Sequence, residues 1–250
     1  MCQLLGVAAN RPVNIAFSFK EWRHRAAENP DGYGFAFWPR GQLEIVKDAQ
    51  DLMGAPSSAI ERVKTVQSPI FVCHVRYANV GPRDGTNTHP FRDVRGAQEY
   101  AFAHNGTVRG IFEMAVSRPA KGKTDSEHAF LWLMDQVSDA DDEEFPHALR
   151  GAAERVRPLG RFNFLLSDGT TLWAYADDSL YYLERSPPFG GRLVSLEQEG
   201  YSIGLDEIKA PDERATLVAT ELLSDEAGWI RLAKGSLLVV RDGLVDAIIS

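Results

Sequence analysis

The chain has 250 residues, an ordinary globular composition and a formal net charge of −8 at pH 7. This length suits one large domain or two small ones, and the negative charge argues against nonspecific binding to nucleic acid or to an anionic membrane surface. No apolar run reaches the roughly 18 residues of a membrane-spanning helix, and the first six residues lack the basic and apolar segments of a signal peptide. We therefore expect a soluble cytoplasmic protein.

The first part of the chain predicts short strands separated by helices and turns. Predicted strands cover residues 3–8, 33–38, 43–47, 70–77 and 100–104, and predicted helices cover 15–27 and 57–66. The stretch 70–77 is almost continuously apolar, which is typical of a strand that is covered on both faces. A segment rich in Gly, Pro, Asn and Arg, residues 78–95, reads as a loop.

The second part begins with Thr124–Glu127, which matches a capping box in which the Thr hydroxyl and the Glu side chain each satisfy a backbone donor of the other. An amphipathic helix follows it, and a second helix over 143–156 ends near Gly160. Predicted strands then cover residues 162–166, 171–175, 180–183, 215–220, 237–241 and 244–249. Because no repeat or linker divides the chain, we expect one domain over 1–250, with two antiparallel sheets packed face to face and helices outside.

Cys2 directly follows the initiator Met1, and a small second residue generally permits removal of the methionine. Cys2 would then carry a thiol nucleophile and a free α-amine, whose pKa of roughly 8 suits it to act as the base of the thiol. The alternative is that Cys2 is simply the second residue of a cytosolic protein. The other cysteine, Cys73, lies inside the apolar stretch, so we expect no structural disulfide.

Three further clusters carry side chains suited to chemistry. Arg76 ends the apolar strand and could hold a carboxylate through two hydrogen bonds. In the sequence His104-Asn105-Gly106, the Asn amide and the Gly N–H could together form an oxyanion hole. Asp125 stands at the start of a predicted helix and could bind a ligand ammonium group. Taken singly, each has an ordinary structural reading: an arginine at a strand end, an Asn-Gly turn, and an acid that complements a helix dipole.

Other signals are weaker. His89 lies in the long loop and could line a pocket, although a lone loop histidine is usually just solvated. His24, His128 and His147 share no metal-ligand spacing with either cysteine, so we predict no zinc site. The chain also lacks the glycine-rich motifs of nucleotide and dinucleotide sites, which argues against an ATP-dependent or dinucleotide-dependent step.

Together these residues resemble the class II glutamine amidotransferases, a branch of the N-terminal nucleophile (Ntn) hydrolases. Cys2 matches the nucleophile position of that family. The stretch His74–Ala78 is similar to its His-x-Arg-aromatic-Ala motif, His104–Gly106 to its His-Asn-Gly motif, and Thr124–Glu127 to its (Thr/Ser)-Asp-(Ser/Thr)-Glu motif. The order and spacing agree over essentially the whole chain, and the small stand-alone YafJ-type members resemble it most.

The resemblance implies a four-layer αββα Ntn-hydrolase sandwich and an enzyme that hydrolyses the side-chain amide of L-glutamine through a Cys2 thioester. It implies catalytic roles for Cys2, Asn105 and Gly106. The substrate-binding residues that it implies are Arg76, Tyr77, His89, His104 and Asp125. No metal or cofactor is implied. If ammonia is transferred rather than released, we expect a separate ammonia-accepting protein.

Two alternatives stay open. The same nucleophile could hydrolyse another γ-glutamyl amide compound. Arg76 and Asp125 would bind only the α-carboxylate and α-ammonium groups, which all γ-glutamyl compounds share. The chain could also be a non-catalytic subunit that binds glutamine, although the intact Cys2 argues against this. One departure from the family pattern concerns Asn79 and Val80, where synthase-linked members often carry Thr and His. It affects the details of carboxylate binding or of ammonia exit.

Overall fold

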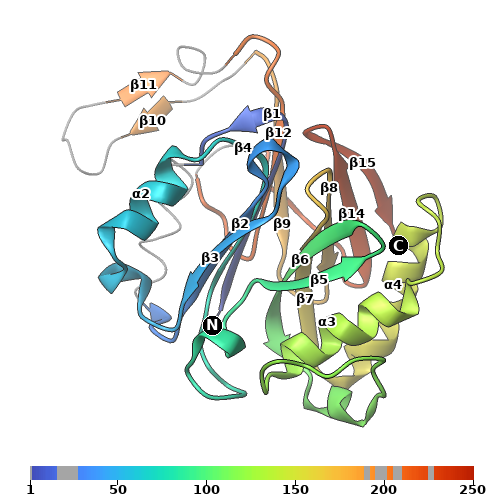
Figure 1. Ribbon diagram of the computed structural model, residues 1–250. Helices are drawn as coiled ribbons and strands as arrows, with labels where there is room; N and C mark the ends of the chain where they lie inside the picture. Colours follow the sequence, from blue (N-terminus) through green and yellow to red (C-terminus); the bar gives the residue numbers. More distant parts are fainter. Residues whose placement is uncertain (1, 16–27, 189–191, 195–201, 205–209, 225–227) are drawn as a thin grey trace.

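The computed structural model describes residues 2–15, 28–188, 192–194, 202–204, 210–224 and 228–250. Two large antiparallel sheets pack face to face within these residues, and helices cover the outer face of each sheet (Figure 1). This confirms the four-layer α+β architecture that the sequence predicts.

Sheet A has seven strands and sheet B has six. In spatial order, sheet A contains β13 (Ile230–Arg231), β9 (Tyr181–Arg185), β12 (Ala215–Ala219), β1 (Gln3–Val13), β4 (Ser68–Val75), β2 (Tyr33–Phe37) and β3 (Glu44–Asp48). In spatial order, sheet B contains β15 (Leu244–Ile249), β14 (Ser236–Arg241), β8 (Thr171–Ala176), β7 (Arg161–Ser167), β6 (Gln98–Thr107) and β5 (Phe91–Arg95). A separate pair consists of β10 (Arg192–Val194) and β11 (Ser202–Gly204).

The helices lie on opposite sides of the two sheets (Figure 1). Helix α2 (Ser57–Thr65) covers sheet A, while α3 (Asp125–Gln136) and α4 (Phe145–Val156) cover sheet B. Short 3-10 turns occupy Pro39–Gly41, Leu52–Gly54, Gly85–Asn87, Arg109–Glu113 and Arg157–Leu159. None of the helices in the described part of the chain combines the length and the apolar composition that a membrane crossing requires.

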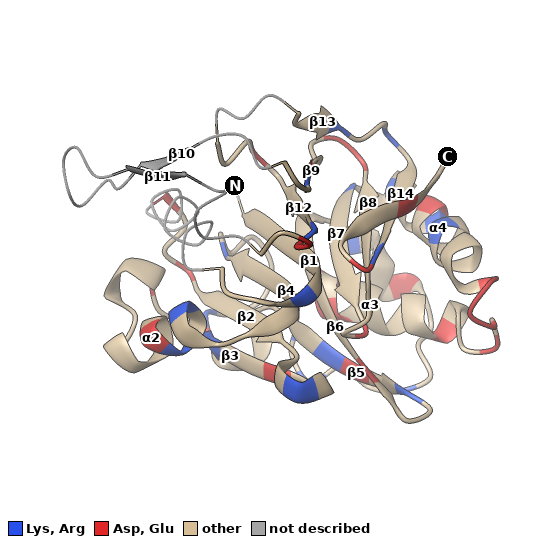
Figure 2. Ribbon diagram, turned by 90° about the horizontal axis from the view of Figure 1, so that it is seen from above, with Lys and Arg blue, Asp and Glu red and all other residues tan. Residues whose placement is uncertain are grey.

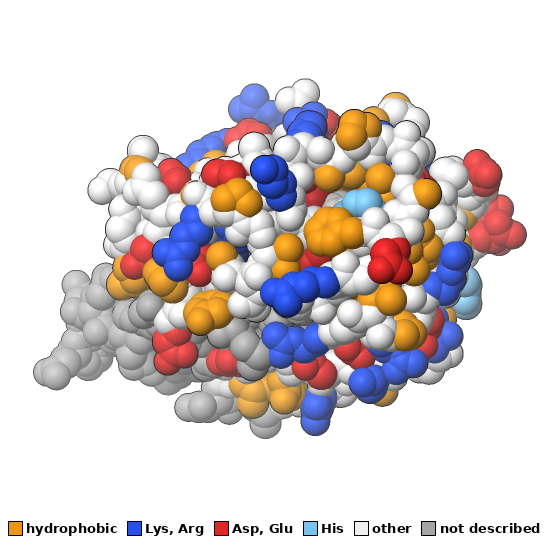
Figure 3. All heavy atoms as spheres, turned by 90° about the horizontal axis from the view of Figure 1, so that it is seen from below, with side chains coloured by type: hydrophobic (Ala, Val, Ile, Leu, Met, Phe, Trp, Pro, Cys, Tyr) orange, Lys and Arg blue, Asp and Glu red, His pale blue; other side chains and the backbone are white. Residues whose placement is uncertain are grey.

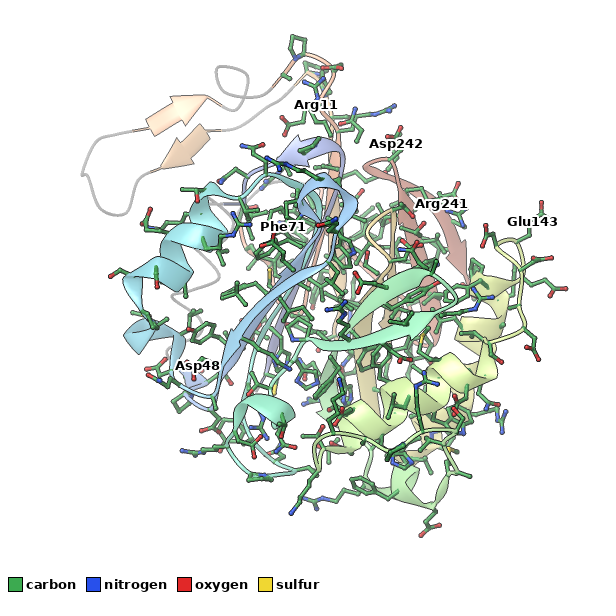
Figure 4. The ribbon with its side chains drawn as sticks, viewed as in Figure 1. Arg11, Asp48, Phe71, Glu143, Arg241 and Asp242 are labelled. Carbon is green, nitrogen blue, oxygen red and sulfur yellow. The ribbon has the colours of Figure 1, made fainter. Side chains whose placement is uncertain are left out.

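Strand alternation explains how one chain fills three core layers, because successive side chains of a strand point to opposite faces. In β1, Leu4 and Ala8 face sheet B, whereas Leu5 and Val7 face the α2 layer. Phe71 of β4 points into the same outer layer (Figure 4). A central strand that is buried on both faces must be apolar throughout, which is the pattern that the sequence shows for β1 and β4.

Most predicted elements are present with boundaries shifted by a few residues, and four strands were not predicted. The segment 78–95, expected to be a loop, ends in β5, and β10, β11 and β13 are also additional. The expected helix 15–27 falls almost wholly outside the described residues. The capping box is only half formed: the Thr124 hydroxyl accepts from the Glu127 N–H, but the Glu127 carboxylate accepts from the N–H groups of Lys121 and Gly122. That arrangement anchors the preceding loop rather than the N-cap.

Candidate active site

Two of the predicted site residues, Cys2 and Asn105, meet at one end of the layer between the two sheets. Gln3 pairs with Val75, so Cys2 lies beside the residues that follow β4. By strand alternation, Cys2 shares the inward face of β1 with Leu4, and Asn105 shares the inward face of β6 with Ala103. The Cys2 thiol directly before β1 and the Asn105 amide of sheet B therefore face each other across the inter-sheet layer.

The thiol of Cys2 lies against the backbone of Tyr77. The Tyr77 N–H donates to Sγ at 3.1 Å, and Sγ lies 3.4 Å from the Tyr77 carbonyl oxygen. Burial raises the pKa of the Cys2 thiol, while the Tyr77 N–H and the positive charges of Arg76 and Arg161 act to lower it. Because burial dominates, the resting thiol is protonated at neutral pH and needs a base before it can act as a nucleophile.

Asn105 is the sheet B residue that contacts Cys2 directly. Its side-chain Nδ2 donates to the carbonyl oxygen of Cys2 at 2.7 Å. The next residue must be glycine on steric grounds, because a Cβ atom at position 106 would lie 1.7 Å from the carbonyl oxygen of Arg161. The Asn-Gly pair is therefore part of a continuous strand, not the tight turn that its sequence alone would favour.

His104 points to the opposite face of β6, toward α3. Its Nε2 lies 3.1 Å from the Arg161 carbonyl oxygen and its Nδ1 lies 2.8 Å from the Ser126 hydroxyl. A carbonyl oxygen can only accept, so Nε2 carries the hydrogen. Burial lowers the pKa of His104, against the opposing effect of Asp125, and the neutral ring then accepts from Ser126. His104 thus joins β6, β7 and α3 from behind the site; its contact with substrate stays a prediction.

Arg76 uses its guanidinium to hold the loop that follows it. Nη1 donates to the Pro82 carbonyl at 3.0 Å, and Nη2 donates to the carbonyls of Val80 at 3.0 Å and Gly81 at 3.4 Å. Any substrate carboxylate at Arg76 would have to replace or share these contacts. Asp31 braces the same loop, since its Oδ2 accepts from the Ala78 N–H at 2.7 Å.

Asp125 is buried at the N-terminus of α3. Its Oδ2 accepts from the Val108 N–H at 2.7 Å, and its Oδ1 accepts from the Ser126 N–H at 3.0 Å. The carboxylate therefore ties the helix to Val108, the residue directly after the end of β6. Each oxygen retains a second lone pair, so these bonds are compatible with an additional ammonium donor.

His89 differs from the expectation that it lies at the rim of a pocket. It is 4% exposed, and its ring lies 4.1 Å from the His74 ring and 4.5 Å from the Phe91 ring, centroid to centroid. Burial lowers the pKa of His74 to about 3 and that of His89 well below its usual value, so both rings are neutral. The segment is buried because it crosses Gly34 closely: a Cβ there would lie 2.0 Å from the His89 carbonyl oxygen.

Three residues at the site were missed by the sequence reasoning: Arg161, Asn163 and Asp178. Asn163 faces inward beside Asn105, accepts from the N–H groups of Asp177 and Asp178, and donates to the Asp178 carboxylate at 2.6 Å. A polar residue inside the apolar run Phe162–Leu166 was the available signal. A buried asparagine needs partners, and here it organises the chain beside β6.

The surface at this end of the molecule carries apolar and basic side chains side by side (Figure 3). Tyr77 and Phe112 each keep 48% of their surface exposed, and the Arg83 side chain keeps 67%. Among the described residues, no group of three or more His, Cys, Asp or Glu side chains is placed to hold a metal ion.

A cavity of about 900 Å³ lies at the outer end of sheet B. Its lining includes Tyr100, Trp173, Glu143 and Arg241 and none of the predicted site residues. Figure 4 shows Glu143 and Arg241 at that outer end of sheet B. Acidic residues occupy the segment that leads into α4 (Figure 2). Volume alone does not identify a functional site, and we take Cys2 as the candidate site because a thiol-bearing residue and an amide donor meet there.

Comparison with known proteins identifies the family of the chain. The family model for class II glutamine amidotransferases matches residues 1–250. An uncharacterised protein of Methanocaldococcus jannaschii is 34% identical over 97% of this chain and 70% of its own length. Escherichia coli YafJ is 31% identical over 94% of this chain and 95% of its own.

Solved structures show the same fold. The crystal structure of a predicted glutamine amidotransferase from Pseudomonas aeruginosa aligns with a TM-score of 0.71 and 25% identity, over 98% of this chain and all (100%) of that one. The glutamine phosphoribosylpyrophosphate amidotransferase of B. subtilis aligns with a TM-score of 0.63 and 15% identity, over 98% of this chain and 48% of that one, which supports the fold alone. The chain is therefore a member of the class II glutamine amidotransferase family.

Proposed function

We propose that this protein hydrolyses the side-chain amide of L-glutamine to glutamate and ammonia, with Cys2 as the nucleophile. The observation that carries the proposal is the contact between Asn105 and Cys2, at 2.7 Å from amide nitrogen to carbonyl oxygen, at the open end of the inter-sheet layer. The contact supports the proposal because the amide donor lies against the residue that carries the thiol, so both could act on one substrate carbonyl.

The first half-reaction forms a thioester. Removal of Met1 would free the α-amine of Cys2, which takes the thiol proton directly or through a water molecule. The thiolate attacks the amide carbon, and the second N–H of the Asn105 amide and the Gly106 N–H stabilise the oxyanion. The protonated amine then gives its proton to the leaving nitrogen, the C–N bond breaks, and ammonia departs.

The second half-reaction returns the enzyme to its starting state. The α-amine takes a proton from water, hydroxide adds to the thioester carbonyl, and the same donors stabilise the second oxyanion. The C–S bond breaks, glutamate leaves, and the proton returns to the thiol. Arg76 would bind the substrate carboxylate and Asp125 its ammonium group, while Tyr77 and His104 would shape the pocket and His89 would support it from the core.

The test measures glutamate and ammonia released from L-glutamine by protein that mass spectrometry shows to begin at Cys2. We expect the two products in equal amounts, and we expect Cys2→Ala to release neither. A panel of γ-glutamyl amides tested in parallel distinguishes free glutamine from a larger substrate with the same head. Release by Cys2→Ala at the parent rate would refute the proposed nucleophile, and no turnover on any panel member would favour a binding subunit.

A further inference from the structure

Arg161 is the first residue of β7, and it contacts the proposed oxyanion strand through both its backbone and its side chain. In the strand register Arg161 pairs with Thr107, directly after Gly106. Its carbonyl oxygen accepts from His104 Nε2 at 3.1 Å, and the backbone of Gly106 passes so close that only glycine fits. Its main chain is therefore fixed relative to Asn105 and Gly106.

The guanidinium of Arg161 lies on the far side of the Asn105 amide from Cys2. Its Nη2 donates to Asn105 Oδ1 at 3.4 Å, while Asn105 Nδ2 donates to the Cys2 carbonyl at 2.7 Å. If the amide were flipped, its NH₂ group would face the guanidinium donors and its oxygen would face a carbonyl oxygen. Both contacts would be repulsive, so Arg161 and the Cys2 carbonyl select the same orientation.

Asp178 and Asn163 hold Arg161 from the other side. Arg161 Nη1 lies 3.6 Å from Asp178 Oδ2, and Asp178 Oδ1 accepts from Asn163 Nδ2 at 2.6 Å and from the Ser179 N–H at 2.6 Å. Burial acts against the charged form of Asp178, but the bonds from Asn163 and Ser179 and the charge of Arg161 lower its pKa overall. The carboxylate therefore remains charged opposite Arg161 at neutral pH.

We propose that Arg161 is a positioning residue of this site: it orients the Asn105 amide toward the reacting carbonyl and holds a positive charge one amide group away from Cys2. The proposal rests on the proposed function for its kinetic consequence. Its electrostatic consequence does not, because the Arg161 charge acts on the Cys2 thiol whether or not glutamine is the substrate. A group that acts only through strand packing would have neither effect.

The test compares Arg161→Gln, Arg161→Lys and the parent, each confirmed to begin at Cys2 and to unfold at a similar urea concentration. The first readout is the pH dependence of Cys2 alkylation by iodoacetamide, mapped by peptide mass. Cys73 is 0% exposed, so the native protein reacts at Cys2. We expect Arg161→Gln to shift the alkylation profile to higher pH by roughly half a unit or more, and Arg161→Lys to shift it less.

The second readout is steady-state turnover of the γ-glutamyl substrate. We expect both variants to lower kcat by about tenfold, with a smaller change in KM. Glutamine lacks the charge of the arginine, and lysine keeps the charge but lacks the planar guanidinium whose Nη2 orients the amide. The matched control is Arg241→Gln, which removes a different sheet B arginine, paired with Asp246 at 2.8 Å and remote from Cys2. It should change neither readout.

The two proposals fail in different ways. An absence of turnover in the parent would refute the glutaminase function, while the alkylation profiles would still report the Arg161 charge. An unshifted profile together with parental kcat in Arg161→Gln would overturn the positioning role. If Arg161→Gln does not fold, Arg161→Lys decides through kcat alone: parental kcat would contradict the proposal, and a tenfold loss with normal stability would support it.

Discussion

The buried asparagine beside the catalytic strand gives a stability prediction that can be worked from the structure. The Asn163 side chain is 0% exposed and accepts from the N–H groups of Asp177 at 2.8 Å and Asp178 at 3.1 Å. Asn163→Ala removes the one oxygen, Oδ1, that accepts from both N–H groups. A buried N–H left without a partner costs about 1–3 kcal/mol, and the Asp178 N–H, which is only partly buried, costs less. We expect a loss of about 2–4 kcal/mol in the free energy of unfolding.

Urea unfolding followed by tryptophan fluorescence measures this loss, with the slope checked for each variant. Asn10→Ala is the matched control, because Asn10 also accepts from a backbone N–H, that of Arg214 at 2.9 Å, and donates to the Asp212 carbonyl at 2.9 Å, but at a site open to water. We expect it to cost less than about 1 kcal/mol. The reasoning is refuted if the two variants are destabilised equally.

Three further predictions concern the buried histidines, the glycine of the oxyanion strand and the helix cap. Since burial holds the pKa of His74 at about 3 and depresses that of His89, the unfolded chain binds more protons than the native chain below pH 6.5. Their stabilising contribution is therefore largest above pH 6.5 and falls as the pH is lowered toward 3. For His74 the loss between pH 6 and 5 is about 1 kcal/mol in urea titrations, and His89 adds a loss in the same direction. Gly106→Ala should reduce glutamine turnover by about 10²–10³-fold, because the new Cβ forces β6 away from β7. Thr124→Ala should cost about 1 kcal/mol in urea, since it removes the hydroxyl that accepts from the Glu127 N–H.

Each of these predictions has a control in the same chain. His147 is exposed, so His147→Gln should leave the pH dependence of stability unchanged, and a parental slope in His89→Gln would contradict the burial argument. Gly151 has nothing within 4 Å of its would-be Cβ, so Gly151→Ala should keep full turnover. Thr124→Ser keeps a capping hydroxyl and should retain most of the stability that Thr124→Ala loses.

Much of this fold follows from the sequence because the sheets are buried on both faces. The continuous apolar runs of β1 and β4 predict central strands. Strand alternation then directs Cys2 of one sheet and Asn105 of the other into the layer between the sheets. The short strands β5, β10, β11 and β13 lack such runs, so local pattern could not separate them from loops.

The sequence predicts those site residues that belong to short motifs, such as Asn105 in His104–Gly106 and Asp125 in Thr124–Glu127. The burial of His89 depends on the crossing at Gly34, which is a contact between distant segments that no short pattern reveals. Arg161 precedes the strand predicted from the sequence, residues 162–166, and reaches the site through the pairing of β6 with β7. Asn163 was visible as a polar residue in an apolar run, but its partners, Asp177 and Asp178, are supplied by the turn after β8.

The measurement that tests the central claim most directly is the mass of the intact protein after rapid acid quenching during turnover of L-glutamine. The thioester mechanism predicts a fraction of chains that carry one glutamyl group, mapped to Cys2, and none in Cys2→Ala. It also predicts that Asn105→Ala, which removes an oxyanion donor, forms the adduct more slowly. Active protein whose adduct maps to another residue, or turnover that persists in Cys2→Ala, would contradict the account.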